Sequence, residues 1–149
     1  MGTRNHIDCS TMSSTLGHTP LRIEPRWTDL DPVGHVNNSV FLIYAEEARA
    51  RYLKALLPGT WDHIVVVHNS IDYHSSVDIS DLIDVTSFVA SVGTSSFATV
   101  NVISTDAGTL CATVRTVQVV VTVDRHASRP WTDHERKALT DAVGALPDS

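Results

Sequence analysis

A single long helical pattern, followed by strand patterns alone up to residue 123, is the feature that most limits how this chain can fold. From Asn38 to Leu57, apolar side chains recur every three or four residues. Asn37 or Asn38 can cap the first turn, and Pro58-Gly59 ends the helix. The pattern predicts an inner face of Val40, Phe41, Tyr44, Ala45, Ala48, Tyr52, Ala55 and Leu56, and an outer face of Glu46, Glu47, Arg49, Arg51 and Lys54.

Runs rich in β-branched residues surround this helix and predict strands. A short alternating run precedes it at Leu21 to Trp27, and longer runs follow at 64–73, 82–92, 96–104 and 110–123. Turn residues between the last three runs predict an antiparallel meander. A capping box beginning at Thr132 predicts a short C-terminal helix through Val143. We therefore expect an α+β fold over residues 21–149, with a five-stranded antiparallel sheet wrapped around the long helix, and a flexible tail at 1–20.

Composition excludes several classes of function. The net charge is -6, and the basic residues are scattered rather than gathered in a stripe, which argues against a nucleic-acid partner. No apolar run approaches the roughly 20 residues of a membrane span, and no signal peptide is recognisable. Cys9 and Cys111 lack the spacing of a disulfide framework or a metal site, and His63, His68 and His74 also fit no standard metal site. We expect a cytoplasmic protein without a metal or other cofactor.

The loop before the long helix concentrates the reactive side chains. Residues 29–38 read Asp-Leu-Asp-Pro-Val-Gly-His-Val-Asn-Asn. Free amides at a helix N-terminus can bind a developing oxyanion, and Gly34 permits close approach of a ligand. Asp31 can then act as a general base or as a nucleophile, with His35 orienting water or substrate. The alternative is that these side chains only cap turns and satisfy backbone groups.

This loop also carries a family resemblance. The run from Trp27 to Asn38, followed by Glu46-Glu47-Ala48-Arg49, resembles the signature of the 4-hydroxybenzoyl-CoA thioesterase family of hotdog enzymes. The similarity continues through Ile71-Asp72-Tyr73 and the turn at Gly93 to Ser96, so it covers essentially residues 21–129. It implies a hotdog fold and hydrolysis of an acyl-CoA, without a cofactor, by a homodimer or homotetramer.

The resemblance also assigns roles to residues. The second aspartate of the motif, Asp31, corresponds to the catalytic carboxylate, and the backbone N–H of Asn38 to the donor that polarises the thioester carbonyl. We therefore expect catalysis by Asp31, His35 and Asn38. The expected substrate-binding residues are Gly34, Asn37, Phe41, Thr94, Ser95 and Ser96.

Other interpretations stay open at this point. The loop is also similar to the D-L-D-x-N-x-H-V-N-N run of plant acyl-ACP thioesterases, except that Val33 replaces the asparagine, which weakens the case for an acyl-ACP substrate. Glu46 and Glu47 are expected to pair with arginines rather than to catalyse. A non-catalytic acyl-CoA-binding protein and a hotdog dehydratase are the remaining alternatives. Thiol release separates a hydrolase from both.

Overall fold

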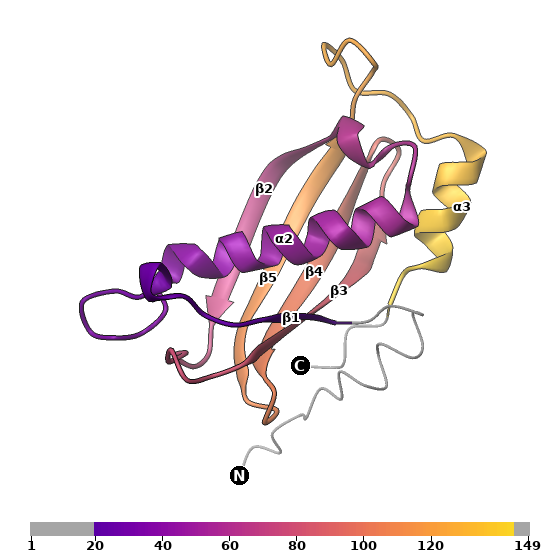
Figure 1. The fold of residues 1–149 in the computed structure, drawn as a ribbon. Coiled ribbons are helices and arrows are strands. Elements are labelled where there is room, and N and C mark those ends of the chain that lie inside the picture. Colours follow the sequence, from indigo (N-terminus) through magenta and orange to yellow (C-terminus); the bar gives the residue numbers. More distant parts are fainter. Residues whose placement is uncertain (1–19, 145–149) are drawn as a thin grey trace.

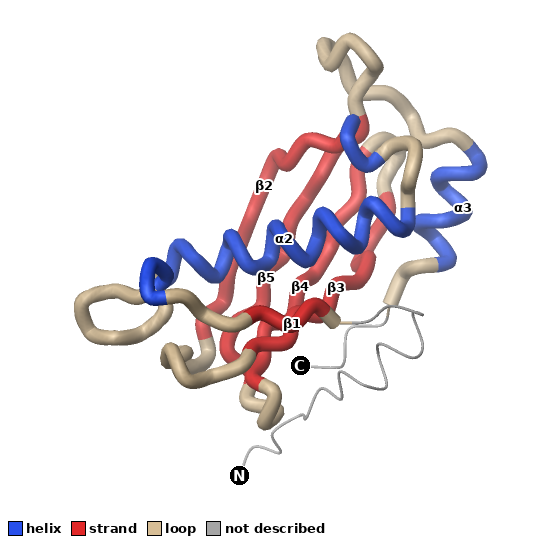
Figure 2. The backbone as a smooth tube through the Cα atoms, viewed as in Figure 1, coloured by secondary structure: helices blue, strands red, loops and turns tan. Residues whose placement is uncertain are grey.

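The computed structural model describes residues 20–144. One long helix, α2 (Asn38–Leu56), crosses one face of a five-stranded sheet, and a short helix, α3 (Asp133–Asp141), packs beside strand β3 (Figure 1). The strands are β1 (Leu21–Ile23), β2 (Ile64–Tyr73), β3 (Ile83–Val92), β4 (Ser96–Thr105) and β5 (Leu110–Val120), and the 3-10 turns are η1 (Trp27–Asp29) and η2 (Trp61–His63). Figure 2 shows the loops gathered at the two ends of the sheet.

Neighbouring strands run antiparallel throughout, in the order β1-β3-β4-β5-β2. Strands β3, β4 and β5 form the predicted meander. Strand β2 directly follows the helix region but pairs with β5 at the far side of the sheet, so its other edge has no partner strand among residues 20–144. This arrangement confirms the predicted hotdog fold.

Several element boundaries differ from the prediction. Strand β1 ends at Ile23, because Pro25 lacks an amide hydrogen and the next amide, that of Arg26, donates to the Asp29 carboxylate over 2.9 Å. Trp27 therefore begins η1 instead of ending a strand. Strand β5 ends at Val120 and α3 at Asp141, a few residues before their predicted ends at Val123 and Val143. Helix α2 ends at Leu56, one residue before the predicted Leu57.

The inner face of α2 packs on the sheet and forms the core. Its buried residues are Val40, Phe41, Tyr44, Ala45, Ala48, Arg49, Tyr52 and Leu53. The prediction that Arg49 lies on the outer face is wrong, since it is only 7% exposed and its Nη1 donates to Thr116 Oγ1 over 3.1 Å. The inner face of β5 is polar at this point, so the guanidinium finds an acceptor there, although burial lowers the pKa of Arg49.

The structure bears on some of the predictions about the cysteines, the N-terminal tail and membrane spans. Cys111 is a free, fully buried thiol, and burial raises its pKa. Cys9 and residues 1–19 of the predicted tail lie outside the described residues. Between residues 20 and 144, no helix has the length and hydrophobicity needed to span a membrane.

Candidate active site

Asp31 sits at the tip of a closed loop that leads into α2. Its Oδ1 accepts the amide hydrogens of Val33 and His35 over 3.0 and 3.2 Å, and its own amide donates to the His35 carbonyl over 2.8 Å. Gly34, with φ at 85°, closes the turn by donating to the Asp31 carbonyl over 3.0 Å. The second oxygen, Oδ2, accepts no hydrogen bond from residues 20–144, which leaves it available to water or substrate.

The other aspartate of the loop, Asp29, has a different environment. It is 3% exposed and accepts hydrogen bonds from the Tyr44 hydroxyl and from the amide and guanidinium of Arg26. Burial by itself raises the pKa of the Asp29 carboxyl, but these hydrogen bonds outweigh burial and hold the pKa below its usual value. The structure therefore gives Asp29 a structural environment and Asp31 an accessible one.

The N-terminus of α2 supplies the polar backbone groups of the site. Asn37 caps the helix, because its Oδ1 accepts from the amide and hydroxyl of Ser39 over 3.0 and 2.9 Å. The Val40 amide donates to the Asn37 carbonyl over 2.9 Å. The Asn38 amide has no acceptor among residues 20–144, so it is the free donor of this first turn.

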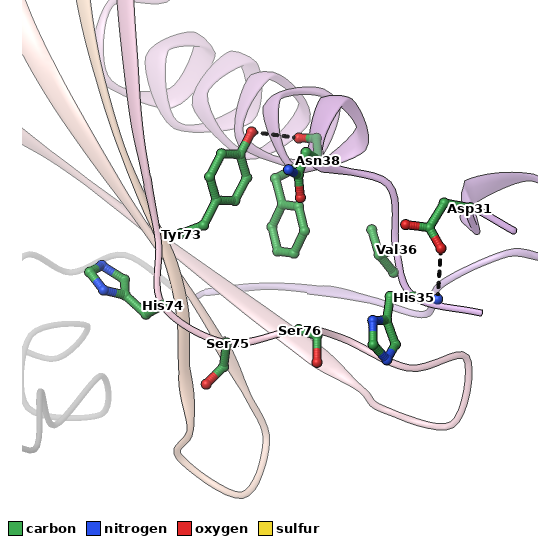
Figure 3. Close-up of a pocket in the computed structure, with 9 residues that line it drawn as sticks. Asp31, His35, Val36, Asn38, Tyr73, His74, Ser75 and Ser76 are labelled. Carbon is green, nitrogen blue, oxygen red and sulfur yellow. Dashed lines mark hydrogen bonds between the residues drawn. The ribbon is translucent and has the colours of Figure 1, made fainter. Parts of the chain in front are cut away.

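A pocket of about 290 Å³ opens between this helix start and the end of β2. Figure 3 shows Asp31, His35 and Asn38 on the helix side of the pocket, with Tyr73 reaching toward Asn38 from the end of β2 and the His74 ring turned away from them. The lining residues are Asp31, His35, Val36, Asn38, Phe41, Tyr73, His74, Ser75 and Ser76. Four of the predicted site residues are thus brought together: Asp31, His35, Asn38 and Phe41.

The imidazole of His35 is turned toward Asp78 rather than toward Asp31. The His35 Nε2 and Asp78 Oδ1 atoms are 3.9 Å apart, and both side chains are well exposed. Its backbone amide, not its ring, is what contacts Asp31. In this arrangement the backbone of His35 stabilises the loop, and its exposed side chain lies at the pocket.

Sequence reasoning missed the sheet side of the pocket. Tyr73 donates its hydroxyl to the Asn38 carbonyl over 2.8 Å, and its ring meets the Phe41 ring edge-on at 5.6 Å between centroids. His74 follows it and lies 3.3 Å from the Thr113 hydroxyl. The only signal in the sequence was the similarity through Ile71-Asp72-Tyr73, which did not say where this strand end would lie.

The predicted residues Thr94 and Ser95, in the β3–β4 turn, and Ser96, the first residue of β4, lie far from Asp31 in the same chain. Ser96 pairs with Val119, at the end of the sheet where β2 begins, whereas the pocket lies where β2 ends at Tyr73. The nine residue steps from Ile64 to Tyr73 separate the two ends by about 30 Å. Gly34 and Asn37 are close to the pocket but do not line it.

The pocket offers few charged or metal-binding side chains. Within residues 20–144, no arginine or lysine lines the pocket. Among the described residues, no three histidine, cysteine, aspartate or glutamate side chains are placed to hold a metal ion together. Glu46 and Glu47 lie outside the pocket and pair with Arg49 and Arg51 over 3.8 and 2.9 Å.

The chain matches one protein-family model and several solved structures. A family model described as the Thioesterase-like superfamily matches residues 25–139. A thioesterase from Thermus thermophilus, solved in complex with coenzyme A and Zn, is 30% identical with a TM-score of 0.76, over 87% of this chain and 96% of that one. YbaW, a probable thioesterase from Escherichia coli, is 26% identical with a TM-score of 0.74, over 85% and 100%.

A third similar structure, a predicted thioesterase from Bacillus stearothermophilus, has a TM-score of 0.78 over 87% of this chain and 98% of that one. At 24% identity it supports the fold alone. No curated protein matches the sequence significantly.

These similarities and the fold agree on one class of protein, the thioester hydrolases with a hotdog domain. The family match spans well over half of the sequence, and the chain belongs to the Thioesterase-like superfamily. The predicted hotdog thioesterase and the enzyme class, a thioester hydrolase, are thereby confirmed. The assignment to the 4-hydroxybenzoyl-CoA thioesterase family in particular stays a prediction.

Proposed function

We propose that this protein hydrolyses an acyl-CoA to the free acid and CoA, with Asp31 as the catalytic carboxylate and the Asn38 amide as the oxyanion donor. The observation that carries the proposal is that one pocket is lined by both Asp31 and Asn38, and that Asp31 Oδ2 and the Asn38 amide are free of partners among residues 20–144. A thioester carbonyl between them meets a hydrogen-bond donor on its oxygen and a base or nucleophile on its carbon.

Two routes use the same groups. As a general base, Asp31 takes a proton from water, the water oxygen attacks the carbonyl carbon, and the carbon–sulfur bond breaks to release the thiolate of CoA. As a nucleophile, the Asp31 carboxylate attacks the carbon, the carbon–sulfur bond breaks to release the thiolate of CoA, and water then hydrolyses the resulting mixed anhydride. In both routes the negative charge that develops on the carbonyl oxygen lies near the Asn38 amide and the positive end of the α2 dipole.

Phe41 and Val36 supply the apolar part of the pocket, where we place the acyl group next to the thioester. The coenzyme A bound in the Thermus thermophilus thioesterase supports CoA as the carrier. An acyl-ACP carrier is the less favoured alternative, because Val33 replaces the asparagine of that motif. The cytoplasmic location expected from the sequence stays a prediction.

The edge of β2 supports a homo-oligomer, either a dimer or a tetramer built from two such dimers. Val65, Val66 and Val67 are 46%, 37% and 60% exposed on this strand, whose outer edge has no partner among residues 20–144. A long apolar edge of this kind favours pairing with a second copy. If two copies pair their β2 strands antiparallel, the start of one lies beside the end of the other. The turn Thr94 to Ser96 of the second copy then lies toward the pocket of the first.

Thiol release from short-chain, long-chain and aromatic acyl-CoAs tests the proposal. We expect Asp31→Asn, which preserves the shape of the side chain, to lower kcat/KM about 100-fold or more. Asp141→Asn is the control, since this exposed aspartate of α3 pairs with Lys137 over 2.8 Å and lies outside the pocket. Equal hydrolysis by wild type and Asp31→Asn would contradict the role of Asp31. Binding of acyl-CoA without thiol release would favour the non-catalytic alternative, and an enoyl thioester product would indicate a dehydratase.

A further inference from the structure

Asp29 and Tyr44 form a buried contact between the Asp31 loop and the body of α2. The Tyr44 hydroxyl donates to Asp29 Oδ2 over 2.7 Å, and the two residues are 5% and 3% exposed. Tyr44 lies well inside the helix, where its ring packs in the same core cluster as Phe41 and Val85. The contact therefore ties the loop to a part of the molecule that the core holds in place.

Asp29 also closes the base of the loop through its backbone. Its carbonyl accepts the amide hydrogen of Asn37, the helix cap, over 2.8 Å. Leu30 and Val36 form the next bridge, and the Asp31 amide bonds to the His35 carbonyl at the tip. Residues 29–37 are thus a narrow two-stranded neck whose base is the Asp29–Asn37 pair and whose tip presents Asp31 to the pocket (Figure 3).

The two side chains are suited to holding position rather than to moving a proton. Hydrogen bonds keep the pKa of Asp29 low despite its burial, and burial, together with the hydrogen bond to Asp29, raises the pKa of Tyr44. The pair therefore stays carboxylate and phenol over the whole working range of pH. A charge-assisted hydrogen bond in a dry site is also stronger and more directional than one between neutral groups.

We propose that Asp29 and Tyr44 are positioning residues for the reaction at Asp31. Through the neck they set the distance between the Asp31 carboxylate and the Asn38 amide, on which attack at a thioester carbon depends. This inference rests on the proposed function. Because misplacement of a reacting group by about 1 Å can lower a rate about 100-fold, loosening the neck should affect the chemical step more than substrate binding.

Tyr44→Phe tests the proposal, because it removes one hydroxyl and keeps the ring. The matched control is Tyr52→Phe, which removes a hydroxyl from another 5% exposed tyrosine of α2, one whose pKa burial raises to about 12. We expect Tyr44→Phe to lower kcat about 10- to 100-fold with KM changed less than about threefold. Tyr52→Phe should leave kcat within about twofold of wild type. Asp29→Asn keeps an acceptor for the Tyr44 hydroxyl. Its kcat should therefore lie between the kcat of wild type and that of Asp29→Ala.

Amide hydrogen exchange of the substrate-free protein gives a readout that does not depend on activity. We expect the Asn37 and Asp31 amides to exchange at least about tenfold faster in Tyr44→Phe than in Tyr52→Phe. Equal exchange in the two variants overturns the proposal, and so does faster exchange without loss of kcat. If wild type releases thiol from no substrate, the proposed function fails, and the exchange rates still decide whether Asp29 and Tyr44 hold the loop.

Discussion

The hydroxyl of Tyr73 donates a hydrogen bond of 2.8 Å to the backbone carbonyl of Asn38, which joins the last residue of β2 to the first residue of α2. The same ring packs edge-on against Phe41. The end of a strand thus holds the start of the helix whose amide we propose as the oxyanion donor. This side chain therefore connects the two sides of the pocket.

Tyr73→Phe should therefore lower both activity and stability by modest amounts. Loss of the hydroxyl removes one partly exposed hydrogen bond, and we expect unfolding in urea to become easier by about 1 kcal/mol. The helix start is then less well held, and kcat/KM should fall about three- to tenfold. Tyr73→Ala also removes the ring contact with Phe41, so it should lower stability and kcat/KM further than Tyr73→Phe does. Wild-type kinetics in Tyr73→Phe would show that this hydrogen bond does not support the site.

Gly34 offers a test of loop conformation separate from any side-chain contact. Its φ of 85° is unfavourable for residues with a Cβ, although a Cβ built there meets nothing within 4 Å. We expect Gly34→Ala to destabilise the fold by about 1 kcal/mol and to lower kcat by shifting the turn that carries Asp31. Gly34→Asn is the matched variant, because asparagine tolerates positive φ better, so it should retain more stability and more activity. The opposite order would contradict the backbone explanation.

Glu135 connects α3 to the loop after α2 and gives a prediction on pH. It is 6% exposed, pairs with Arg129 over 2.8 and 2.9 Å, and accepts from Thr60 over 2.6 Å. The hydrogen bonds from the Arg129 guanidinium are the main reason that the pKa of Glu135 lies well below its usual range, and together with those from Thr60 and Thr132 they outweigh burial. A carboxyl whose pKa is lower in the folded than in the unfolded chain stabilises the fold. This contribution is fully present above the pKa of the unfolded chain, about 4.3, and it declines as pH falls below that value.

Urea unfolding of wild type and Glu135→Gln at several pH values measures this contribution. At pH 7 we expect the variant to be less stable by about 2 to 3 kcal/mol, because Arg129 then lacks its charged partner. Below about pH 4 the difference should shrink by about 1.4 kcal/mol per pH unit. A difference that does not change with pH would mean that Glu135 titrates alike in the folded and unfolded chain.

The β2 edge predicts how the oligomer can be disrupted. Val67 is 60% exposed on this strand, and we expect Val67→Lys to shift the protein toward monomers, since a lysine on an edge strand opposes pairing with another strand. Light scattering during size-exclusion chromatography measures the mass. Val143→Lys is the control, because Val143 is 42% exposed and bridges to β3, on the other side of the sheet from β2. A monomeric wild type, or an unchanged mass in Val67→Lys, would contradict assembly through β2.

Much of the fold and half of the site could be predicted because the relevant information is local in the chain. Helical and strand periodicities predicted α2 to within one residue and the four long strands to within a few. Asp31, His35 and Asn38 lie within eight consecutive positions, so any turn between a strand and a helix start brings them together. The family resemblance then predicted Asp31, rather than Asp29, as the catalytic carboxylate.

What the sequence determined by itself was therefore the set of elements and the reactive loop, since each depends on neighbours a few residues apart. The tertiary structure decided which distant groups meet that loop. Tyr73 reaches Asn38, and Tyr44 reaches Asp29, only because the order of the strands and the rotation of α2 place them there. Arg49 faces the sheet for the same reason, although its charge predicted the solvent side. Helix rotation and strand order result from packing between segments far apart in the chain, which a one-dimensional pattern does not contain.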